Sequence, residues 1–455
     1  MVRSVLGAVR FALIVALAAP QPGRAMQAPQ PHLPNHARAL NFDFPGVRIG
    51  VAEYREGPTG ATVFHFPQPV AVAVDVRGGA PGTINTDALR LSYDEPFVDA
   101  ITFAGGSSYG LSVATGVAEA LRDQRADPGA LANIATVAGA IIFDLGPRRF
   151  TTVTPDGALG RAALAAARPG IFPLGAVGAG RFATQGGFFD ARTYSGQGGA
   201  IRQSGPTKVA VFTVVNALGH VVGRDGRVVR CAGPTPDDCG TIHGRIQGKL
   251  DKIAPPAGPP AGGPSGNTTL TLVLTNQKLP VWALQRLATQ VHMAMGRAIQ
   301  PYATTADGDV LFAATTAAVD NPALSVENLS LLASEAAWDA VLASVPRLDP
   351  PATRGHPPSE AALRSYAGTY EFAPGMNVTI EEEAGRLWAR GPARSNLYLP
   401  AQGRALLEPT GPADFRIAAP RGDRLRFERV RNRVTGLTIN PGHWPISARR
   451  IRQPR

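Results

Sequence analysis

The sequence predicts a mixed α+β protein that consists of a large layered body followed by a small antiparallel β domain. A chain of 455 residues is too long for one ordinary core, so two or three domains are expected. The apolar content of 44% and the charged content of 17% are typical of folded chains. A Pro-rich stretch, LDPPATRGHPPSE, separates two regions of different composition. We therefore expect a body at 26–346, a linker at 347–358 and a second domain at 359–455.

Strands and Ala-rich helices alternate before the linker, which favours a layered body. The expected elements are strands at 71–79 and 100–106, helices at 110–122 and 158–167, and a pair of strands within 208–223. A further helix is expected after Pro280, because apolar residues then recur on one face. These residues are Leu284, Leu287, Ala288, Val291, Met295 and Ala298.

Beyond the linker, the pattern changes to short alternating segments separated by turns. They are SYAGTYEF, NVTIEEE, RLWARG, NLYLPA, DFRIAA, RLRFERV and VTGLTINP. Alternation with a period of two is typical of antiparallel strands. We expect this part of the chain to form a small antiparallel sheet or barrel.

The first 25 residues have the composition of a secretory signal. Arg3 and Arg10 precede the apolar run from Phe11 to Ala19, and small residues stand at Gly23 and Ala25. The run is short for a membrane span, so cleavage is favoured over an uncleaved anchor. The interpretation is a periplasmic or secreted protein that has no membrane segment once residues 1–25 are removed.

The two cysteines, Cys231 and Cys239, close a Pro/Asp-rich loop. An oxidising compartment favours a disulfide between them, with two free thiols as the alternative.

Charge and histidine content exclude several functional classes. The net charge of +11 comes from scattered arginines, and aromatic residues make up only 7%, so a nucleic-acid surface is not expected. The eight histidines are dispersed without metal-ligand spacing. We expect no metal and no cofactor.

One candidate nucleophile is Ser108, in the motif GSSYG between a predicted strand and a predicted helix. This motif matches the G-x-S-x-G turn of serine hydrolases. Asp190 with His220 or His292 would complete a triad. The alternative is a structural or substrate-lining loop, whose backbone amides simply begin a helix.

A second candidate lies at the stretch GGPSGNTTLTLVLTN, residues 262–276, where a Gly/Pro-rich segment meets an apolar strand. A Thr at such a junction either ends a loop or becomes a new N-terminus after cleavage.

Eight motifs in order, from Phe44 to Thr316, resemble the self-cleaving L-aminopeptidase/D-amidase-esterase family, which includes the β-peptidyl aminopeptidases. The motifs are PGVRIGVAEY, VAVDVRGGAPGTINTD, ITFAGGSSYGLSVATGV, GAIIFDLG, LGAVGAG, VVNALGHVV, NTTLTLVLTN and DGDVLFAATT. The resemblance implies a four-layer αββα sandwich of the N-terminal-nucleophile type. It also implies that the precursor is cut between Asn267 and Thr268.

The resemblance assigns roles to four residues. The Thr268 hydroxyl would attack the Asn267 carbonyl, and the α-amine freed by the cut would then be its general base. Asn216 would donate a hydrogen bond to the oxyanion. Asp307 and Asp309 would orient the hydroxyl or balance the new ammonium group, or would form only a turn before the next strand.

The substrates implied are small peptides, amides or esters, and the implied assembly is a homo-oligomer of processed heterodimers. Where the aminopeptidases carry polar residues, this chain has Ile141, Ile142 and Phe143 ahead of Asp144. Capture of a free substrate amine is therefore less favoured than binding of an apolar acyl group, unless Asp144 supplies the charge. Ser107 and Ser108 are expected to line the substrate.

The segment Ala361 to Ile451 resembles the small lipocalin-like β domain that follows many secreted β-lactamase-type and peptidase domains. Packing, gating or partner binding is its expected role. Besides the threonine hydrolase, two other functions stay open: a serine hydrolase that uses Ser108, and a non-catalytic exported binding protein with the same fold.

Overall fold

The computed structural model describes the chain in segments. They are residues 28–36, 38–90, 97–127, 129–145, 152–190, 192–231, 239–252, 266–345, 358–373, 375–391, 399, 403–418, 423–431, 433–441 and 444–451. The predicted signal segment and almost all of the predicted linker lie outside these residues.

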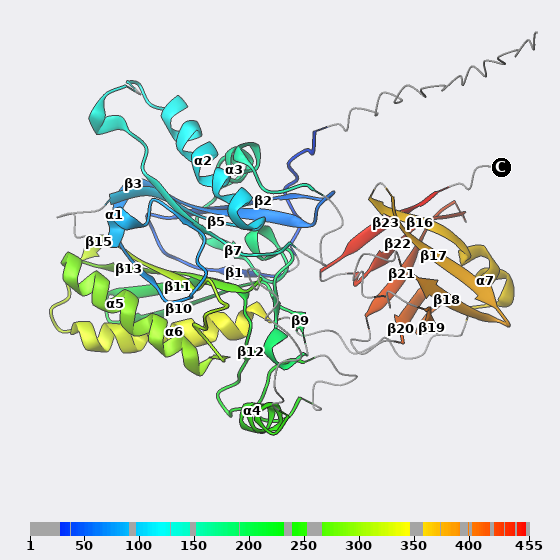
Figure 1. The fold of residues 1–455 in the computed structure, drawn as a ribbon. Helices are drawn as coiled ribbons and strands as arrows, with labels where there is room; N and C mark the ends of the chain where they lie inside the picture. The colour runs from blue at the N-terminus through cyan, green and yellow to red at the C-terminus, as the bar shows by residue number, and fades with distance from the viewer. Residues whose placement is uncertain are drawn as a thin grey trace, which may run out of the picture.

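The body has four layers, two of strands between two of helices (Figure 1). The strand order is β10-β11-β13-β15-β3-β5-β6-β4, and β2 also pairs with β3. The long strand β3 (Thr59–Val76) belongs to both layers: its first half pairs with β2 and β5, and its second half pairs with β15. The predicted strand at 71–79 is thus the second half of a longer element.

One strand layer contains β2, β5, β6 and β4 beside the first half of β3. Their bounds are Arg48–Tyr54 for β2, Phe97–Ala104 for β5, Val137–Ile141 for β6 and Thr83–Ile84 for β4. The other layer contains β10 (Gln197–Ser204), β11 (Thr207–Asn216), β13 (Thr268–Gln277) and β15 (Val310–Val319).

Aromatic side chains fill the space between the two strand layers. The Phe64 ring lies 5.5 Å from the Phe212 ring, and the Phe103 ring lies 6.2 Å from the Phe312 ring, measured between centroids. All four residues are fully buried. Because side chains alternate along a strand, the neighbouring residues face the helices on the outside.

The helices α2 (Ser112–Asp123) and α3 (Gly157–Ala165) cover the first layer, and α5 (Val281–Ala294) and α6 (Val326–Ser344) cover the second. Val63 of β3 packs in the cluster under α2 and α3, and Val273 of β13 packs in the cluster over α5 and α6. The predicted four-layer αββα sandwich is confirmed.

The expected elements differ from the structure mainly at their ends. The predicted pair of strands within 208–223 consists of the long β11 and a two-residue strand, β12 (His220–Val221). Met295 and Ala298 are buried as expected, but they lie beyond the end of α5.

The short elements of the chain complete the description. They are β1 (Ala39–Asn41), α1 (Asp87–Arg90), η1 (Ser107–Leu111), η2 (Leu131–Asn133), β7 (Ile171–Pro173), η4 (Gly178–Gly180), β8 (Thr184–Gln185), η5 (Gly187–Phe189), β9 (Thr193–Tyr194), α4 (Ile242–Leu250), η7 (Met295–Arg297) and β14 (Ile299–Gln300).

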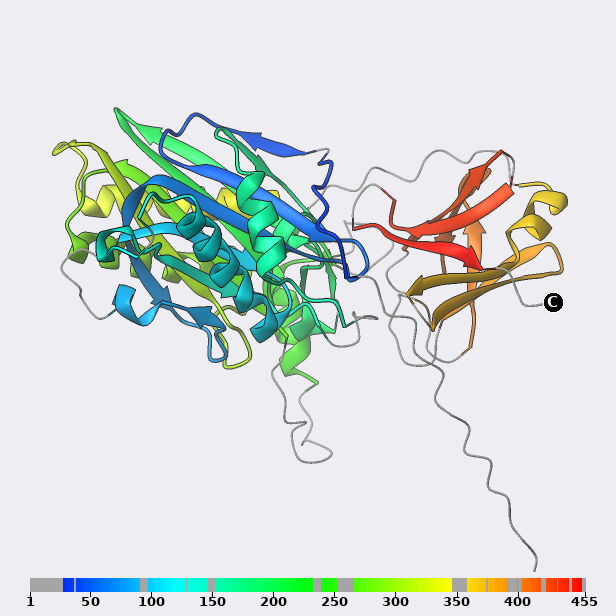
Figure 2. The ribbon, with the colours of Figure 1, turned by 90° about the horizontal axis from the view of Figure 1, so that it is seen from above.

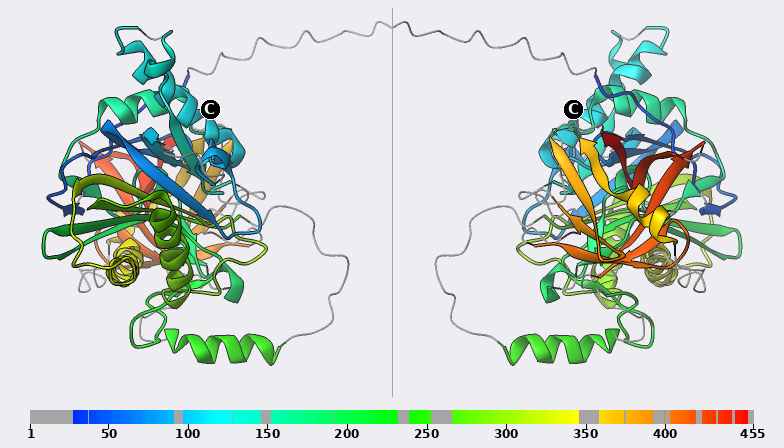
Figure 3. Two further views of the ribbon diagram at one scale, coloured as in Figure 1. Left: turned by 90° about the vertical axis from the view of Figure 1, so that its left-hand side faces the viewer. Right: turned by 90° about the vertical axis from the view of Figure 1, so that its right-hand side faces the viewer.

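The C-terminal part is a closed antiparallel barrel of strands β16 to β23, which confirms the predicted small β domain. Its strands are β16 (Gly368–Ala373), β17 (Met376–Glu383), β18 (Arg386–Arg390), β19 (Ala405–Pro409), β20 (Asp414–Ile417), β21 (Arg424–Val430), β22 (Arg433–Ile439) and β23 (Ile446–Ile451). The barrel lies beside the body (Figure 2), and its strands form a closed ring (Figure 3). The hydrophobic core of the barrel is continuous with Phe182 and Tyr194 of the body. The helix α7 (Glu360–Tyr366) lies at the far side of the barrel from the body.

Candidate active site

The predicted nucleophile, Thr268, is the first residue of β13, in the middle of the second strand layer. Its neighbours are the last residue of β11, Asn216, which is its antiparallel register partner, and the start of β15, which runs parallel to β13. Just before these strands, Asn267 forms a bridge with Asp307. The end of β11 and the starts of β13 and β15 therefore lie at the same end of the strands, which brings Thr268, Asn216 and Asp307 together.

The peptide group between Asn267 and Thr268 is held by two donors. The Thr268 hydroxyl donates a close hydrogen bond to the Asn267 carbonyl oxygen. The backbone N–H of Gly308 donates to the same oxygen at 3.1 Å. Asn267 and Thr268 are each only 2% exposed. A fixed backbone donor on this carbonyl would stabilise negative charge that develops there.

Gly308 has to be glycine because the chain passes so close to the nucleophile. A Cβ atom at this position would lie 2.6 Å from the Thr268 hydroxyl oxygen and 2.7 Å from the carbonyl oxygen of Ala80. Ala80 in turn donates its backbone N–H to the carbonyl of Asp307 at 2.8 Å. The loop after β3 thus supports the loop before β15, against which Thr268 packs.

Asp309 is completely buried, and its carboxylate accepts backbone hydrogen bonds from Thr269 at 2.5 Å and Ala303 at 3.0 Å. Burial and, as a smaller cause, the charge of Asp307 raise the pKa of Asp309 to about 8, although the two backbone donors oppose the rise. By bonding to the N–H next to the nucleophile, Asp309 fixes the start of β13.

Asp307 is the second buried carboxylate of the loop. It accepts hydrogen bonds from the Thr304 hydroxyl at 2.8 Å and from the backbone N–H of Leu218 at 3.3 Å. Burial raises the pKa of Asp307, and these hydrogen bonds lower it. The contact with Leu218 ties this loop to the turn that follows Asn216.

The Asn216 amide lies beside the acyl side of the Asn267–Thr268 bond. Its Nδ2 donates to the carbonyls of Phe143 at 3.1 Å and Gly266 at 3.3 Å, and its Oδ1 accepts from the Thr184 backbone N–H at 3.1 Å. Asn216 is therefore hydrogen-bonded to Gly266, the residue just before Asn267, whereas Gly308 is hydrogen-bonded to the Asn267 carbonyl itself.

Arg192 was not among the residues predicted from the sequence. Its Nη1 donates to the Thr184 hydroxyl at 3.0 Å and to the Asn267 side-chain oxygen at 3.4 Å. The guanidinium lies over Gly187, where a Cβ atom would come within 2.5 Å of it. Arg192 thus adds a positive charge beside the residue on the acyl side of the bond.

Phe143 forms an apolar wall of the site. A Cβ atom on Gly266 would lie 1.9 Å from the Phe143 ring, so the ring packs directly against the chain before Asn267. The neighbouring Asp144 is fully buried, and it accepts hydrogen bonds from the Thr59 hydroxyl at 2.8 Å and from the Gly106 N–H at 2.7 Å. Asp144 holds the turn at the end of β5 in place.

The residues of the alternative serine triad are not brought together. Ser108 is exposed in η1, whereas Asp190 forms an ion pair with Lys249 at 2.9 Å. The buried rings of the two histidines bond elsewhere: His220 Nδ1 to Gln185 at 2.9 Å, and His292 Nδ1 to Asp75 at 2.8 Å. Burial, with the charge of Arg245 as a smaller cause, lowers the pKa of His220 to about 4.

Ser107 has a left-handed backbone (φ +54°) and donates its N–H to the Ile142 carbonyl at 3.0 Å. The GSSYG loop is thereby attached to the chain that leads to Phe143. This is compatible with the predicted substrate-lining role of Ser107 and Ser108.

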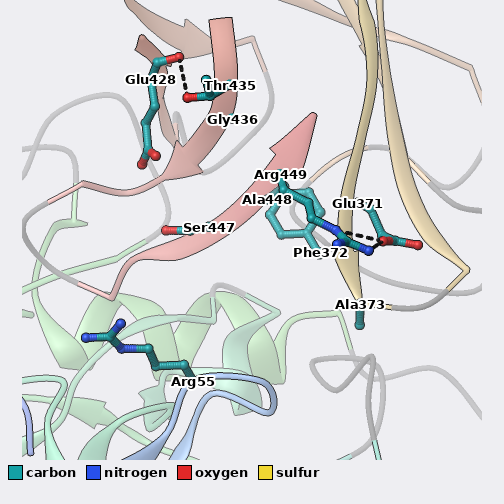
Figure 4. A pocket seen from close by; sticks show the side chains of 10 residues that line it. All are labelled: Arg55, Glu371, Phe372, Ala373, Glu428, Thr435, Gly436, Ser447, Ala448 and Arg449. Carbon is teal, nitrogen blue, oxygen red and sulfur yellow. Dashed lines mark hydrogen bonds and ion pairs between the residues drawn. The ribbon is translucent and has the colours of Figure 1, made fainter. Parts of the chain in front are cut away.

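A cavity of about 690 Å³ lies between the barrel and Arg55 of the body, away from the residues just described (Figure 4). Its lining includes an ion pair between Arg449 and Glu371. No candidate catalytic residue lines it.

Cys231 and Cys239 are joined by a disulfide with their Cα atoms 5.6 Å apart. Within the described segments, no cluster of His, Cys, Asp and Glu suits a metal ion, and no helix is long and apolar enough to cross a membrane.

The model of peptidase family S58 matches residues 42–348. The chain belongs to peptidase family S58. The resemblance drawn from the eight motifs is confirmed, and the protein is a hydrolase that acts on amide bonds.

Curated relatives in this family share a large part of the chain. The 6-aminohexanoate-oligomer endohydrolase of Paenarthrobacter ureafaciens is 42% identical over 314 residues, which covers 67% of this chain and 85% of that protein. An uncharacterized aminopeptidase of Mycobacterium leprae (strain TN) is 34% identical over 269 residues, which covers 57% and 72%. Among solved structures, a Burkholderia sp. β-aminopeptidase aligns with 70% of this S58 chain and 89% of its own, at 18% identity and a TM-score of 0.48.

Sequence reasoning missed Gly308 and Arg192 in this S58 site. The motif DGD predicted the loop correctly, but the prediction concerned its two aspartates. The glycine between them, Gly308, donates its backbone N–H to the Asn267 carbonyl. Arg192 carries no local signal, because its contact with Asn267 arises only when β8 and β9 fold beside β13.

Replacing Gly308 tests whether the close contact between its backbone and the Thr268 hydroxyl is needed for activity. We expect Gly308→Ala to lower the kcat/KM for amide hydrolysis by about 100-fold, since a displacement of about 1 Å at the reacting atoms costs that much. Steady-state rates on a chromogenic amide would measure the change. Gly296→Ala is the matched control, because its added Cβ meets nothing within 4 Å. An active Gly308→Ala enzyme would show that the close approach is dispensable.

Proposed function

We propose that the protein cuts its own Asn267–Thr268 bond and then hydrolyses amide bonds with Thr268 as an N-terminal nucleophile. The observation that carries the proposal is the pair of hydrogen bonds on the Asn267 carbonyl, one from the Thr268 hydroxyl and one from the Gly308 N–H. The nucleophile and an oxyanion donor thus lie at the same buried peptide group.

In the processing step, the Thr268 oxygen attacks the Asn267 carbonyl carbon and gives up its proton. The Gly308 N–H stabilises the oxyanion, and collapse of the intermediate breaks the C–N bond. The products are an ester between Asn267 and the Thr268 oxygen, and the α-amine of Thr268, which takes up the proton. Water then hydrolyses the ester to the Asn267 carboxylate and restores the hydroxyl.

In catalysis, the new α-amine acts as the general base for the neighbouring hydroxyl. An α-amine has a pKa of about 8 in model compounds, so a useful fraction is unprotonated near neutral pH. A substrate carbonyl would occupy the place of the Asn267 carbonyl, with its acyl chain along Asn216 and Phe143. Formation and hydrolysis of an acyl ester on Thr268 complete the cycle.

The cut chain is expected to stay together as a heterodimer. Strand β13, which would begin the second chain, pairs with β11 of the first chain, and β15 of the second chain pairs with β3 of the first. Association of heterodimers into a homo-oligomer is part of this proposal.

We infer that the substrates are internal amide bonds rather than bonds next to a free amine. The three carboxylates predicted at the site, Asp144, Asp307 and Asp309, are buried and accept hydrogen bonds from the protein itself. A substrate ammonium group would have to compete with these donors. The Phe143 ring instead offers apolar surface to an acyl chain.

The name of one relative supports this choice of bond, whereas other relatives are named aminopeptidases. A protein named 6-aminohexanoate-oligomer endohydrolase shares 42% identity over 67% of this chain. We propose linear oligoamides with apolar spacers as the substrate class.

We also propose that the protein is exported and acts in an oxidising compartment. The signal-like first 25 residues and the cysteine pair of the sequence support this location.

Substitutions at the junction test the nucleophile. We expect Thr268→Ala to remain a single, inactive chain on a denaturing gel, because it lacks the attacking oxygen. Thr268→Ser should be cut and active, since it keeps the hydroxyl. Thr269→Ala is the control: its side chain points to the opposite face of β13, so cutting should continue. A Thr268→Ala protein that is cut or hydrolyses amides would rule out this nucleophile.

A pair of substrates tests the preference for internal bonds. An oligoamide of an apolar ω-amino acid would be compared with the same molecule acetylated at its amine, and products would be separated by chromatography. We expect the acetylated form to be cleaved with a kcat/KM at least equal to that of the free amine. A loss of more than about tenfold on acetylation would instead indicate an aminopeptidase.

Fractionation and thiol labelling test the location. In a bacterial host with the full chain, we expect the protein in the exported fraction, with neither Cys231 nor Cys239 labelled by a thiol reagent after denaturation without reductant. Labelling of both cysteines, or recovery entirely from the cytosol, would contradict export.

A further inference from the structure

The turn between β22 and β23 of the barrel inserts an aromatic side chain into the body. Trp444 is fully buried, and its ring stacks in parallel on Phe182, with centroids 4.3 Å apart and planes 1° apart. The Tyr194 ring meets Trp444 edge-on at 4.7 Å. Aromatic contacts of this geometry stabilise beyond their buried area.

Polar contacts surround this aromatic cluster. Asn440 of the barrel donates to the Tyr194 hydroxyl at 2.8 Å, and also to Asp423 of the barrel at 3.3 Å. Arg181 of the body donates to the Pro445 carbonyl at 2.5 Å, and it pairs with the buried Glu53 at 3.2 Å. The interface is therefore fixed in orientation as well as buried.

One of the body residues in contact with the barrel, Tyr194, lies in a small two-stranded ribbon, and Arg181 and Phe182 lie just before the first strand of that ribbon. Strand β8 pairs with β9 through Thr184↔Tyr194 and Gln185↔Thr193. Figure 1 shows β9 on the side of the body that faces the barrel. A ribbon with two residues in each strand is not stable alone, so it depends on what packs against it.

The same ribbon reaches the candidate active site on its other side. The Thr184 N–H donates to the Asn216 side-chain oxygen at 3.1 Å, and the Thr184 hydroxyl accepts from Arg192 at 3.0 Å. Thr184 is the direct register partner of Tyr194. One residue pair thus separates the Trp444 cluster from Asn216.

We propose that Trp444 of the barrel is a positioning residue for amide hydrolysis, which holds the β8–β9 ribbon so that Thr184 orients Asn216 and Arg192. The barrel is then an integral support of the active site rather than an independent module. This inference rests on the proposed function, because it places Asn216 and Arg192 around the substrate of Thr268.

Substitution of Trp444 tests the inference in the full-length protein. We expect Trp444→Ala to lower kcat about tenfold or more, with a change in KM below threefold, since the acyl side of the site loses its alignment. Rates are normalised to the amount of folded, cut protein recovered from gel filtration. Hydrogen exchange should accelerate in the ribbon but not in the barrel strands. Trp444→Phe should recover most of the rate, because it keeps a stacking ring.

Trp388→Ala provides the matched control. This tryptophan also belongs to the barrel, but it lies on β18, where Arg404 sits 4.4 Å above its ring. We expect its kcat to stay at the wild-type value. A Trp444→Ala enzyme with wild-type kcat, or equal losses in the two alanine variants, would overturn the inference.

Tyr194→Phe keeps the test open if Trp444→Ala does not fold. It removes only the hydroxyl that accepts from Asn440, and we expect a loss of about threefold in kcat; an unchanged kcat would overturn the inference.

A denaturing gel of the wild-type protein distinguishes failure of the positioning role of Trp444 from failure of the proposed function. A wild-type chain that is uncut refutes the nucleophile, whereas a cut, active wild type with a fully active Trp444→Ala variant refutes only the positioning role.

Discussion

Parallel pairing between β13 and β15 places the first residue of one strand beside the loop that leads into the other. Because both strands begin at the same edge, the N–H of Gly308 reaches the Asn267 carbonyl, and only a glycine leaves room for the Thr268 hydroxyl. The antiparallel strand β11 ends at this edge with Asn216. Because β11, β13 and β15 are neighbours in one strand layer, these three strand ends lie side by side.

Two buried carboxyl groups at this end of the strands would be costly without compensation. Asp307 and Asp309 are tolerated because backbone N–H groups point at them, from Leu218, Thr269 and Ala303. These hydrogen bonds tie the end of β11, the start of β13 and the loop before β15 into one unit. Burial raises the pKa of Asp309 to about 8, so its proton is released only as the pH rises above the ordinary carboxyl range. Any stability that depends on this proton is present below about pH 4 and is lost as the pH approaches 8.

Local patterns in the sequence predicted the layered body, an apolar strand within 262–276 and the antiparallel C-terminal domain, because strand and helix periods are local properties. The position Thr268 came from the resemblance to the family. Local patterns did not predict α6, whose buried face consists largely of Ala and Ser and gives little apolar contrast. The contacts of Gly308 and Arg192 with Asn267, and of Trp444 with the ribbon, join segments far apart in the chain. Such contacts depend on register and docking, which no local pattern specifies.

Direct sequencing of the smaller chain of the wild-type protein tests the central claim. If Thr268 attacks the Asn267 carbonyl, the purified protein contains a chain that begins Thr-Thr-Leu-Thr-Leu and continues to Arg455. An active-site-directed acylating reagent that abolishes activity should add its acyl group to Thr268 at the start of this chain. A fully active protein that remains one chain, or that begins its second chain at another residue, would contradict the account.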